Sequence, residues 1–136
     1  MKELTRADEE IHVKGKTIEE IFENAAKALT EIMANTKTIR SRKTENITMR
    51  EKDEEELLFH YLEDILLLKD SEQILFKKFS CTIKKERAYF RLHCTAKGDT
   101  INKKQELRTD VKGITRHEFS LAKTRKGWEA TIVVDV

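Results

Sequence analysis

The 136 residues leave room for one domain, and we interpret residues 1–136 as a single domain long enough to form its own core. Hydrophobic and charged residues each make up 38% of the chain, which is typical of a globular protein with a highly charged surface and excludes a disordered chain. Because 27 Lys and Arg oppose 25 Asp and Glu, the net charge is only +2, without the basic excess of a dedicated nucleic-acid-binding protein.

A strand and a helix are predicted first. Ile11 and Val13 alternate with polar residues, which indicates a short strand ahead of a turn at Gly15. Residues 17–20 form a capping box, in which a Thr hydroxyl and a Glu carboxylate each accept a hydrogen bond from a free backbone N–H. Apolar residues then recur at helical spacing as far as about Asn35, so a helix is expected over that stretch.

The rest of the chain predicts a second helix and a series of strands. A short strand at 46–50 precedes a cluster of acids at 53–56, which suits the positive end of a helix dipole, and this helix continues to about Leu68. Alternating segments after it indicate five strands, at about 74–83, 88–97, 105–112, 114–122 and 128–135. This order predicts an α+β fold with two helices packed on one face of a mixed or antiparallel sheet of about six strands.

The two cysteines are interpreted as buried thiols that stay reduced. A hairpin that closes at residues 84–87 puts Cys81 opposite Phe90. It leaves Cys94 opposite Lys77, so that the thiols face the core several residues apart along the ladder. The first segment lacks the apolar core of a signal peptide, and no apolar run approaches the ~18 residues of a membrane span. We therefore expect a cytoplasmic protein with no membrane contact.

Most familiar catalytic patterns are missing from the chain. There is no Gly-rich phosphate loop, no G-x-S-x-G segment, and no pair of Cys or His at metal-ligand spacing. Basic clusters at 38–43 and 84–87 have the charge to contact RNA phosphates. Because no aromatic residues are interleaved to stack on bases, solvated loops are the favoured interpretation of both clusters.

The first and last predicted strands each carry an acid on the side away from the core. Asp8 lies on the polar side of the first strand, and Asp135 follows the inward-facing Val134 of the last. If the two strands are neighbours, these carboxylates and the terminal carboxylate of Val136 offer oxygen ligands for a hard cation such as Ca²⁺ or Mg²⁺. The residues alone do not decide between such a metal site and exposed acids that bind nothing, and they favour the exposed acids.

Several segments, taken together in order and spacing, resemble the archease family from about Thr5 to Val136. They are Ala7-Asp8 and residues 15–26, 57–62, 111–115 and 133–136. Archeases activate RtcB-type RNA ligases, which join tRNA halves and other cleaved RNAs. The resemblance implies an archease-like fold and an accessory protein, not an enzyme, that promotes the metal-dependent guanylylation of such a ligase and its repeated turnover.

The resemblance also assigns roles to individual residues. The family's metal ligands fall on Asp8, Asp135 and Val136, with Ca²⁺ as the favoured cation and Mg²⁺ or Mn²⁺ as alternatives. Lys112 matches a family lysine that is implicated in activating the ligase. The chain departs from the family at Thr5-Arg6, where His-Thr is usual, and at Arg116, where an aromatic residue is usual.

Two other functions stay open on the sequence. A diverged, RNA-associated binding module without ligase activation is favoured by the basic clusters and by the change at Thr5-Arg6. A metal-dependent hydrolase that acts alone is disfavoured, because no general base accompanies the proposed ligands.

Overall fold

The computed structural model describes residues 8–136 and contains two helices and six strands in this part of the chain. Both helices and a short 3₁₀ turn lie in the first half or just past it, and strands make up most of the rest. In chain order the elements are β1 (Asp8–Gly15), α1 (Ile18–Met33), the 3₁₀ turn (Thr36–Thr38), β2 (Lys43–Glu51), α2 (Glu54–Glu72), β3 (Ile74–Lys85), β4 (Phe90–Thr100), β5 (Gly113–Thr124) and β6 (Gly127–Asp135).

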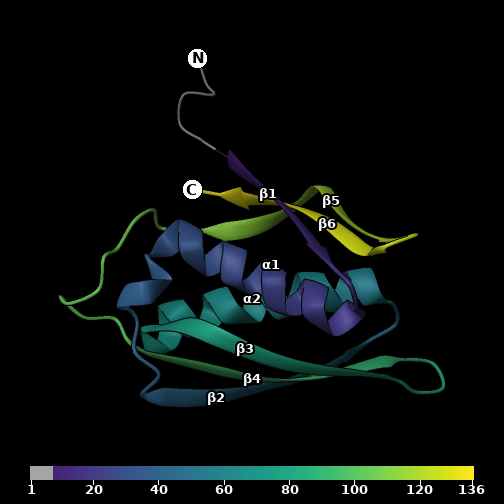
Figure 1. Ribbon diagram of the computed structural model, residues 1–136, viewed down its shortest axis with the longest axis horizontal. Helices are drawn as coiled ribbons and strands as arrows, with labels where there is room; N and C mark the ends of the chain where they lie inside the picture. The colour runs from purple at the N-terminus through teal and green to yellow at the C-terminus, as the bar shows by residue number, and fades with distance from the viewer. Residues whose placement is uncertain (1–7) are drawn as a thin grey trace.

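The strands form two separate antiparallel sheets, and the helices lie between them (Figure 1). The strand order is β1-β6-β5 in one sheet, called the upper sheet here, and β2-β4-β3 in the other, the lower sheet. The α+β class with two helices and six strands is confirmed. The predicted single sheet is instead two, because α2 buries apolar side chains over much of its circumference and needs partners on both sides.

Both helices begin at the residues that the capping patterns indicate. The Thr17 hydroxyl accepts the Glu20 N–H at 3.1 Å, and the Lys16 N–H donates to the Glu20 carboxylate at 2.8 Å. At α2, the Asp53 carboxylate accepts the Glu56 N–H at 2.8 Å. Each cap satisfies backbone donors that have no partner inside the helix. In residues 8–136, no helix is both long and apolar enough to cross a membrane.

The strand predicted at 105–112 is wrong. This segment makes only an isolated bridge, between Leu107 and Ala34, and it connects the lower sheet with the upper one. The Arg108 and Thr109 N–H groups donate to the carbonyl oxygens of Met33 and Ile32, at 2.8 and 3.0 Å. The segment therefore bonds the free carbonyls at the end of α1, which satisfies its backbone without a neighbouring strand.

The predicted hairpin register between β3 and β4 is also wrong. The turn comprises residues 86–89, so Lys85 is paired with Phe90 and Cys81 lies directly opposite Cys94. The polar residues at the turn carry no periodicity that could distinguish this register from one shifted along the chain. Both cysteines are buried and free, as predicted.

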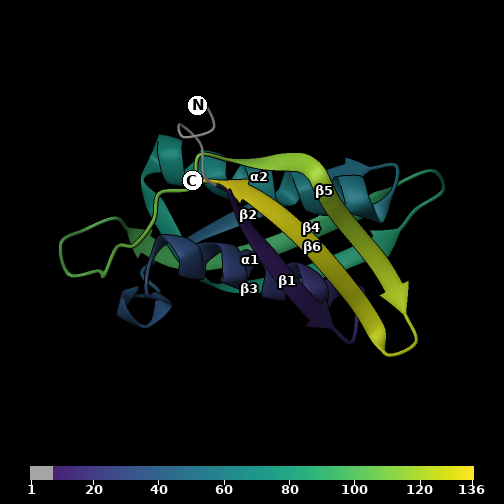
Figure 2. The ribbon, with the colours of Figure 1, turned by 90° about the horizontal axis from the view of Figure 1, so that it is seen from above.

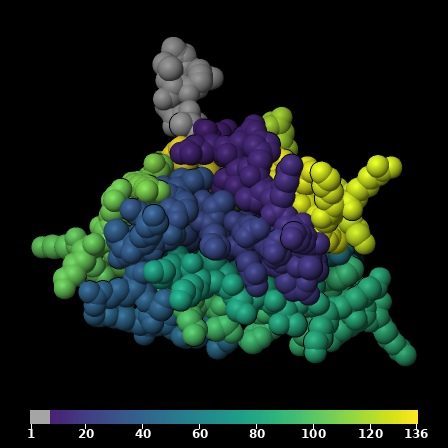
Figure 3. Space-filling model, viewed as in Figure 1, coloured from purple at the N-terminus to yellow at the C-terminus, as the bar shows by residue number. Residues whose placement is uncertain are grey.

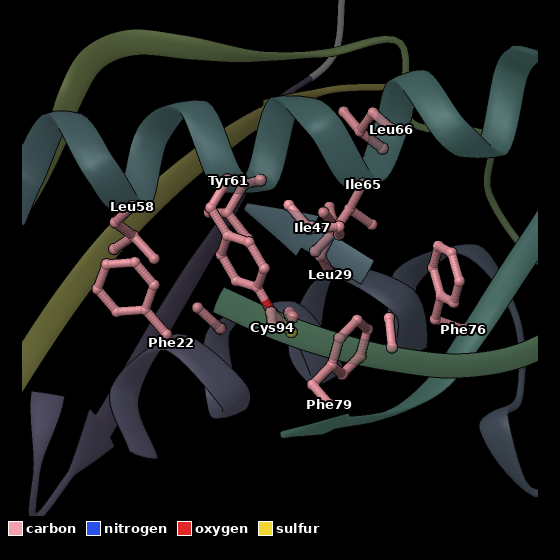
Figure 4. Packing of buried hydrophobic residues seen from close by; sticks show 14 of the residues in the cluster. Phe22, Leu29, Ile47, Leu58, Tyr61, Ile65, Leu66, Phe76, Phe79 and Cys94 are labelled. Atoms are coloured by element: carbon pink, nitrogen blue, oxygen red, sulfur yellow. The ribbon is translucent and has the colours of Figure 1, made fainter. Parts of the chain in front are cut away.

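Tyr61 of α2 occupies the centre of the core (Figure 4). Its ring stacks on Phe22 with the centroids 5.6 Å apart, and its hydroxyl lies 3.3 Å from the Cys94 sulfur and 3.5 Å from that of Cys81. Burial raises the pKa of Tyr61 well above its usual value, so the hydroxyl stays neutral. The phenol thus joins α1, α2 and the lower sheet while its polar atom keeps hydrogen-bond partners.

Candidate functional site

The ends of β1 and β6 bring the two predicted acids together. Asp8 is the direct cross-strand partner of Asp135, and Gly113 of β5 is the partner of Asp135 on its other side. Figure 2 looks onto this sheet, with the start of β1 beside the end of β6. Because directly opposed residues project from the same face of a sheet, both carboxylates lie on one face. That face is turned away from the helices, since the neighbouring Val134 belongs to the hydrophobic core cluster and Val133 does not.

Two acids at opposed positions carry an electrostatic cost. Asp8 is exposed and Asp135 is half-buried. Like charges directly opposite each other destabilise a pair of strands by a few tenths to about 1 kcal/mol. A cation held by both carboxylates would offset this like-charge effect.

Val136 directly follows Asp135, and its position is fixed by packing. Its side chain is half-buried against the hydrophobic core. This contact holds Val136 beside the Asp8–Asp135 pair.

Lys112 is connected to Asp135 through the backbone. Its N–H donates to the Asp135 carbonyl oxygen at 2.8 Å, and its side chain is exposed. The four residues that the sequence singles out therefore come from three chain segments that meet at one end of the upper sheet. An ammonium group on a flexible stem at this position can reach an anion that approaches the carboxylates from outside.

The donor set consists entirely of oxygen atoms, and it is small. In the part of the chain that the structure describes, no group of three or more His, Cys, Asp or Glu side chains is arranged to hold a metal. Asp8, Asp135 and a terminal carboxylate fit a hard cation in ligand type, but Ca²⁺ takes about six to eight oxygen ligands. A Ca²⁺ ion at this pair would therefore need further oxygen ligands from outside these residues.

A buried lysine that the sequence analysis missed holds the segment before Lys112. The Lys69 ammonium of α2 donates to the Asp110 carboxylate at 2.6 Å and to the Val111 carbonyl oxygen at 3.2 Å. It also lies 3.0 Å from the Asp70 carboxylate. Burial by itself lowers the pKa of Lys69, but the hydrogen bonds to Asp110 and Asp70 outweigh that effect, and the pKa lies above its usual value.

The sequence does contain a signal for this lysine. Lys69 follows Ile65 by four residues, which puts it on the buried stripe of α2, and only 6% of the residue is exposed. A lysine on such a stripe needs a carboxylate partner, because an isolated buried charge is strongly unfavourable. Lys69 thus fixes residues 110–111 and with them the start of β5.

Arg116 joins β5 to α2 by a pair of contacts. Its guanidinium donates two hydrogen bonds to the Glu56 carboxylate and lies 4.0 Å from the centroid of the Phe59 ring. The hydrogen bond from Arg116 holds the pKa of Glu56 below its usual value. The planar guanidinium covers an aromatic face as another ring would, which accounts physically for arginine at a position where the family resemblance predicts an aromatic residue. The other departure, Thr5-Arg6, lies outside the described residues.

Comparison with known proteins gives a consistent result over nearly the whole chain. A sequence model of the Archease protein family matches residues 3–136. The chain is 33% identical to the archease of Methanosarcina barkeri over 132 residues, which cover 96% of this chain and 90% of that protein. It is also 33% identical to the archease of Thermococcus kodakarensis, with 96% and 93% of the two chains covered.

Solved structures are similar in fold as well. The solution structure of protein 1598 of Methanobacterium thermoautotrophicum superposes with a TM-score of 0.86 at 31% identity, covering 96% of this chain and 93% of the other. The crystal structure of an archease from Thermotoga maritima, described as a possible chaperone, superposes with a TM-score of 0.61. At 20% identity, with 96% and 90% of the two chains covered, that second likeness concerns the fold alone.

Proposed function

This chain belongs to the archease family, and we propose that it activates an RtcB-type RNA ligase by promoting the metal-dependent guanylylation and repeated turnover of that ligase. The observation that supports this function is the pairing of β1 with β6, in which Asp8 lies opposite Asp135 and the Lys112 backbone is bonded to Asp135. Two acids and a lysine at one exposed end of a sheet suit contact with a phosphorylated or metal-containing centre.

Each residue has a distinct part in this proposal. Asp8, Asp135 and the terminal carboxylate of Val136 would hold a divalent cation, with Ca²⁺ favoured and Mg²⁺ or Mn²⁺ as alternatives. When bound, the cation supplies positive charge at the surface that faces the ligase. Lys112 contacts a phosphate or an acidic group of the complex. The chain forms and breaks no covalent bond itself, and it acts in the cytoplasm where the ligase and its RNA substrates are found.

The small number of ligands supports an accessory role. A site with two side-chain carboxylates and a chain terminus leaves coordination positions open. Groups of the ligase or of its nucleotide fill those positions in the complex, so the complete site exists only at the interface. A stand-alone metalloenzyme would instead need a general base beside the ligands.

Ligase turnover tests the proposal. A limiting amount of an RtcB-type ligase is given excess cleaved RNA, GTP and divalent metal, with or without trace amounts of this protein. We expect the wild type to support many joining events per ligase. The Asp135→Asn variant keeps the size of the side chain but removes its charge, and we expect it to lower this stimulation about tenfold or more. Asp64→Asn, which removes the same charge from α2, serves as the matched control and should stimulate as the wild type does.

Two results would count against the proposal in different ways. Equal stimulation by Asp135→Asn and the wild type would reject the metal site but retain the activator. No stimulation by a folded wild-type protein would reject the activator and favour the RNA-associated binding module instead.

A further inference from the structure

Four basic side chains gather around a hollow formed where the chain leading into β2 meets the chain that follows β4. These two segments lie on the same side of the molecule as the C-terminus (Figure 1). Arg40 and Arg42 precede β2, and Lys103 and Lys104 lie in the turn that follows β4. The hollow has a volume of about 430 Å³. In Figure 3 the segment after β4 protrudes at the left edge, next to the chain that leads into β2. We call these four residues and the space between them the basic hollow.

The charges of the basic hollow are not neutralised within the described residues. All four side chains are exposed, and none forms an ion pair there. Asp99 also lines the hollow, but it is buried and its carboxylate accepts the Thr100 N–H at 2.9 Å. Four cations against one buried carboxylate leave the hollow strongly positive, although the whole chain is almost neutral.

Hydrogen bonds fix the two backbone segments that carry these cations. The Arg42 N–H donates to the Gly98 carbonyl oxygen at 2.8 Å, which continues the pairing of β2 with β4. On the other side, the buried Gln105 side chain donates to the Thr100 carbonyl oxygen at 3.0 Å and accepts the Asn102 N–H at 3.2 Å. The backbone is therefore preorganised, and binding an anion requires the ordering of side chains only.

We propose that the basic hollow binds the phosphate backbone of RNA. Arginine and lysine together neutralise successive phosphates, and the guanidinium groups of Arg40 and Arg42 suit bidentate contact with phosphate oxygens. No aromatic side chain lines the hollow, so it reads the backbone rather than stacking on bases. The choice of RNA as the partner rests on the proposed function, because a protein docked on an RNA ligase lies beside the ligase's polyanionic substrate.

The other basic cluster provides a contrast and a control. Lys84 and Lys85 lie at the hairpin of β3 and β4, at the opposite end of the lower sheet from the basic hollow (Figure 1). The Lys85 ammonium lies 5.3 Å from the Phe90 ring centroid, and the nearby Arg91 is paired with Glu86 at 3.0 Å. Lys85 and Arg91 therefore have partners within the protein, whereas the basic hollow combines four cations, from two segments far apart in the chain, that form no ion pair with residues 8–136.

RNA binding by the full chain tests the proposal without any ligase. The probe is a fluorescein-labelled single-stranded RNA, and its anisotropy is measured between 50 and 200 mM salt. Contacts with single-stranded phosphates give a slope of about 0.7 per phosphate in a plot of log affinity against log salt. For the wild type we expect a slope of about 3, and for Arg40→Gln/Arg42→Gln a weaker affinity and a slope lower by about 1.4. Lys84→Gln/Lys85→Gln removes the same charge and should leave both values unchanged.

Three results would overturn the proposal, given circular dichroism that shows every variant folded. Unchanged RNA affinity in Arg40→Gln/Arg42→Gln rejects the basic hollow as the binding surface. If both double variants lose RNA affinity equally, the binding depends on the net charge of the protein and not on the basic hollow. A loss of ligase guanylylation measured without RNA in Arg40→Gln/Arg42→Gln would assign the hollow to an acidic protein surface. The activator function is tested separately by Asp135→Asn, so failure of either proposal can be told from failure of the other.

Discussion

The lower and upper sheets are built from different parts of the chain and carry different features. The lower sheet comes from one contiguous stretch, residues 43–100, and its long strands pair with a single irregularity, between Phe76 and Lys78. The upper sheet combines strands from both ends of the described chain, and the pairing of β5 with β6 is interrupted between Thr115 and Ser120. In that interruption Glu118 has a φ of +59°. Both sheets contribute side chains to the core, and the irregular one also presents the candidate site.

The space available for a side chain also differs between positions in the two sheets. At Gly98 of the lower sheet the neighbouring backbone leaves no room for a side chain, whereas a Cβ at Gly113 of the upper sheet, beside Asp135, would meet nothing within 4 Å. Three variants test this difference. One compares the two sheets directly, and the other two remove contacts between α2 and the upper sheet.

The largest effect is expected for Gly98→Ala in β4. A Cβ at this position would lie 1.9 Å from the Leu75 carbonyl oxygen and 2.6 Å from the Phe76 Cα, and backbone atoms cannot rotate away. We expect the free energy of unfolding to fall by about 3 kcal/mol or more, measured by urea denaturation. Gly113→Ala in β5 is the matched control, because a Cβ there meets nothing within 4 Å. That variant should be unchanged or more stable by up to about 1 kcal/mol. Similar losses in both variants would contradict the comparison.

A smaller effect is expected for Lys69→Met, which removes the contact of α2 with the start of the upper sheet. Methionine keeps the length of the side chain but leaves the Val111 carbonyl oxygen and the Asp110 carboxylate without the ammonium donor. We expect a loss of about 1–3 kcal/mol in unfolding free energy. Hydrogen exchange should also become faster at the Lys112 amide, which bonds to Asp135. If exchange there is unaffected while stability falls, Lys69 supports the fold without positioning Lys112.

The smallest effect is expected for the exposed contact of Arg116 with Glu56. Because the folded state lowers the pKa of Glu56 from its ordinary value of 4.5, the contact stabilises the protein above that pH. The stabilisation is lost as the pH falls through the lowered pKa. The denaturation midpoints of the wild type and Arg116→Gln should therefore differ slightly at pH 7 and converge as the pH falls through the lowered pKa of Glu56. A difference that stays constant would assign the whole effect to the Phe59 contact, which does not titrate.

Local signals predicted the helices well, and long-range pairing was the main source of error. The caps at Thr17 and Asp53 involve residues three apart, so the sequence alone indicates them. Whether six strands form one sheet or two depends on contacts across the helix layer, which no local period encodes. The same limit explains the register of Cys81 and Cys94 and the use of residues 105–112 as a cap for α1.

The candidate site was predictable in part. The polar positions of Asp8 and Asp135 follow from strand alternation, but their direct pairing depended on the two strands being neighbours. The role of Lys69 was overlooked although its place on the buried stripe was visible. Arg40 and Arg42 of the basic hollow lie in the basic cluster at 38–43 that the sequence shows. Their meeting with Lys103 and Lys104 was not predictable, because it depends on the way β2 pairs with β4.

The pairing of Asp8 with Asp135 joins the two ends of the described chain. The completion of folding could therefore be followed through cation binding. A cation held between these residues, as proposed, would bind only molecules in which β1 has already closed against β6. By mass action, such a ligand at a hundred times its dissociation constant favours the closed state by about 2.7 kcal/mol. Cation occupancy would then report the fraction of molecules that have completed folding.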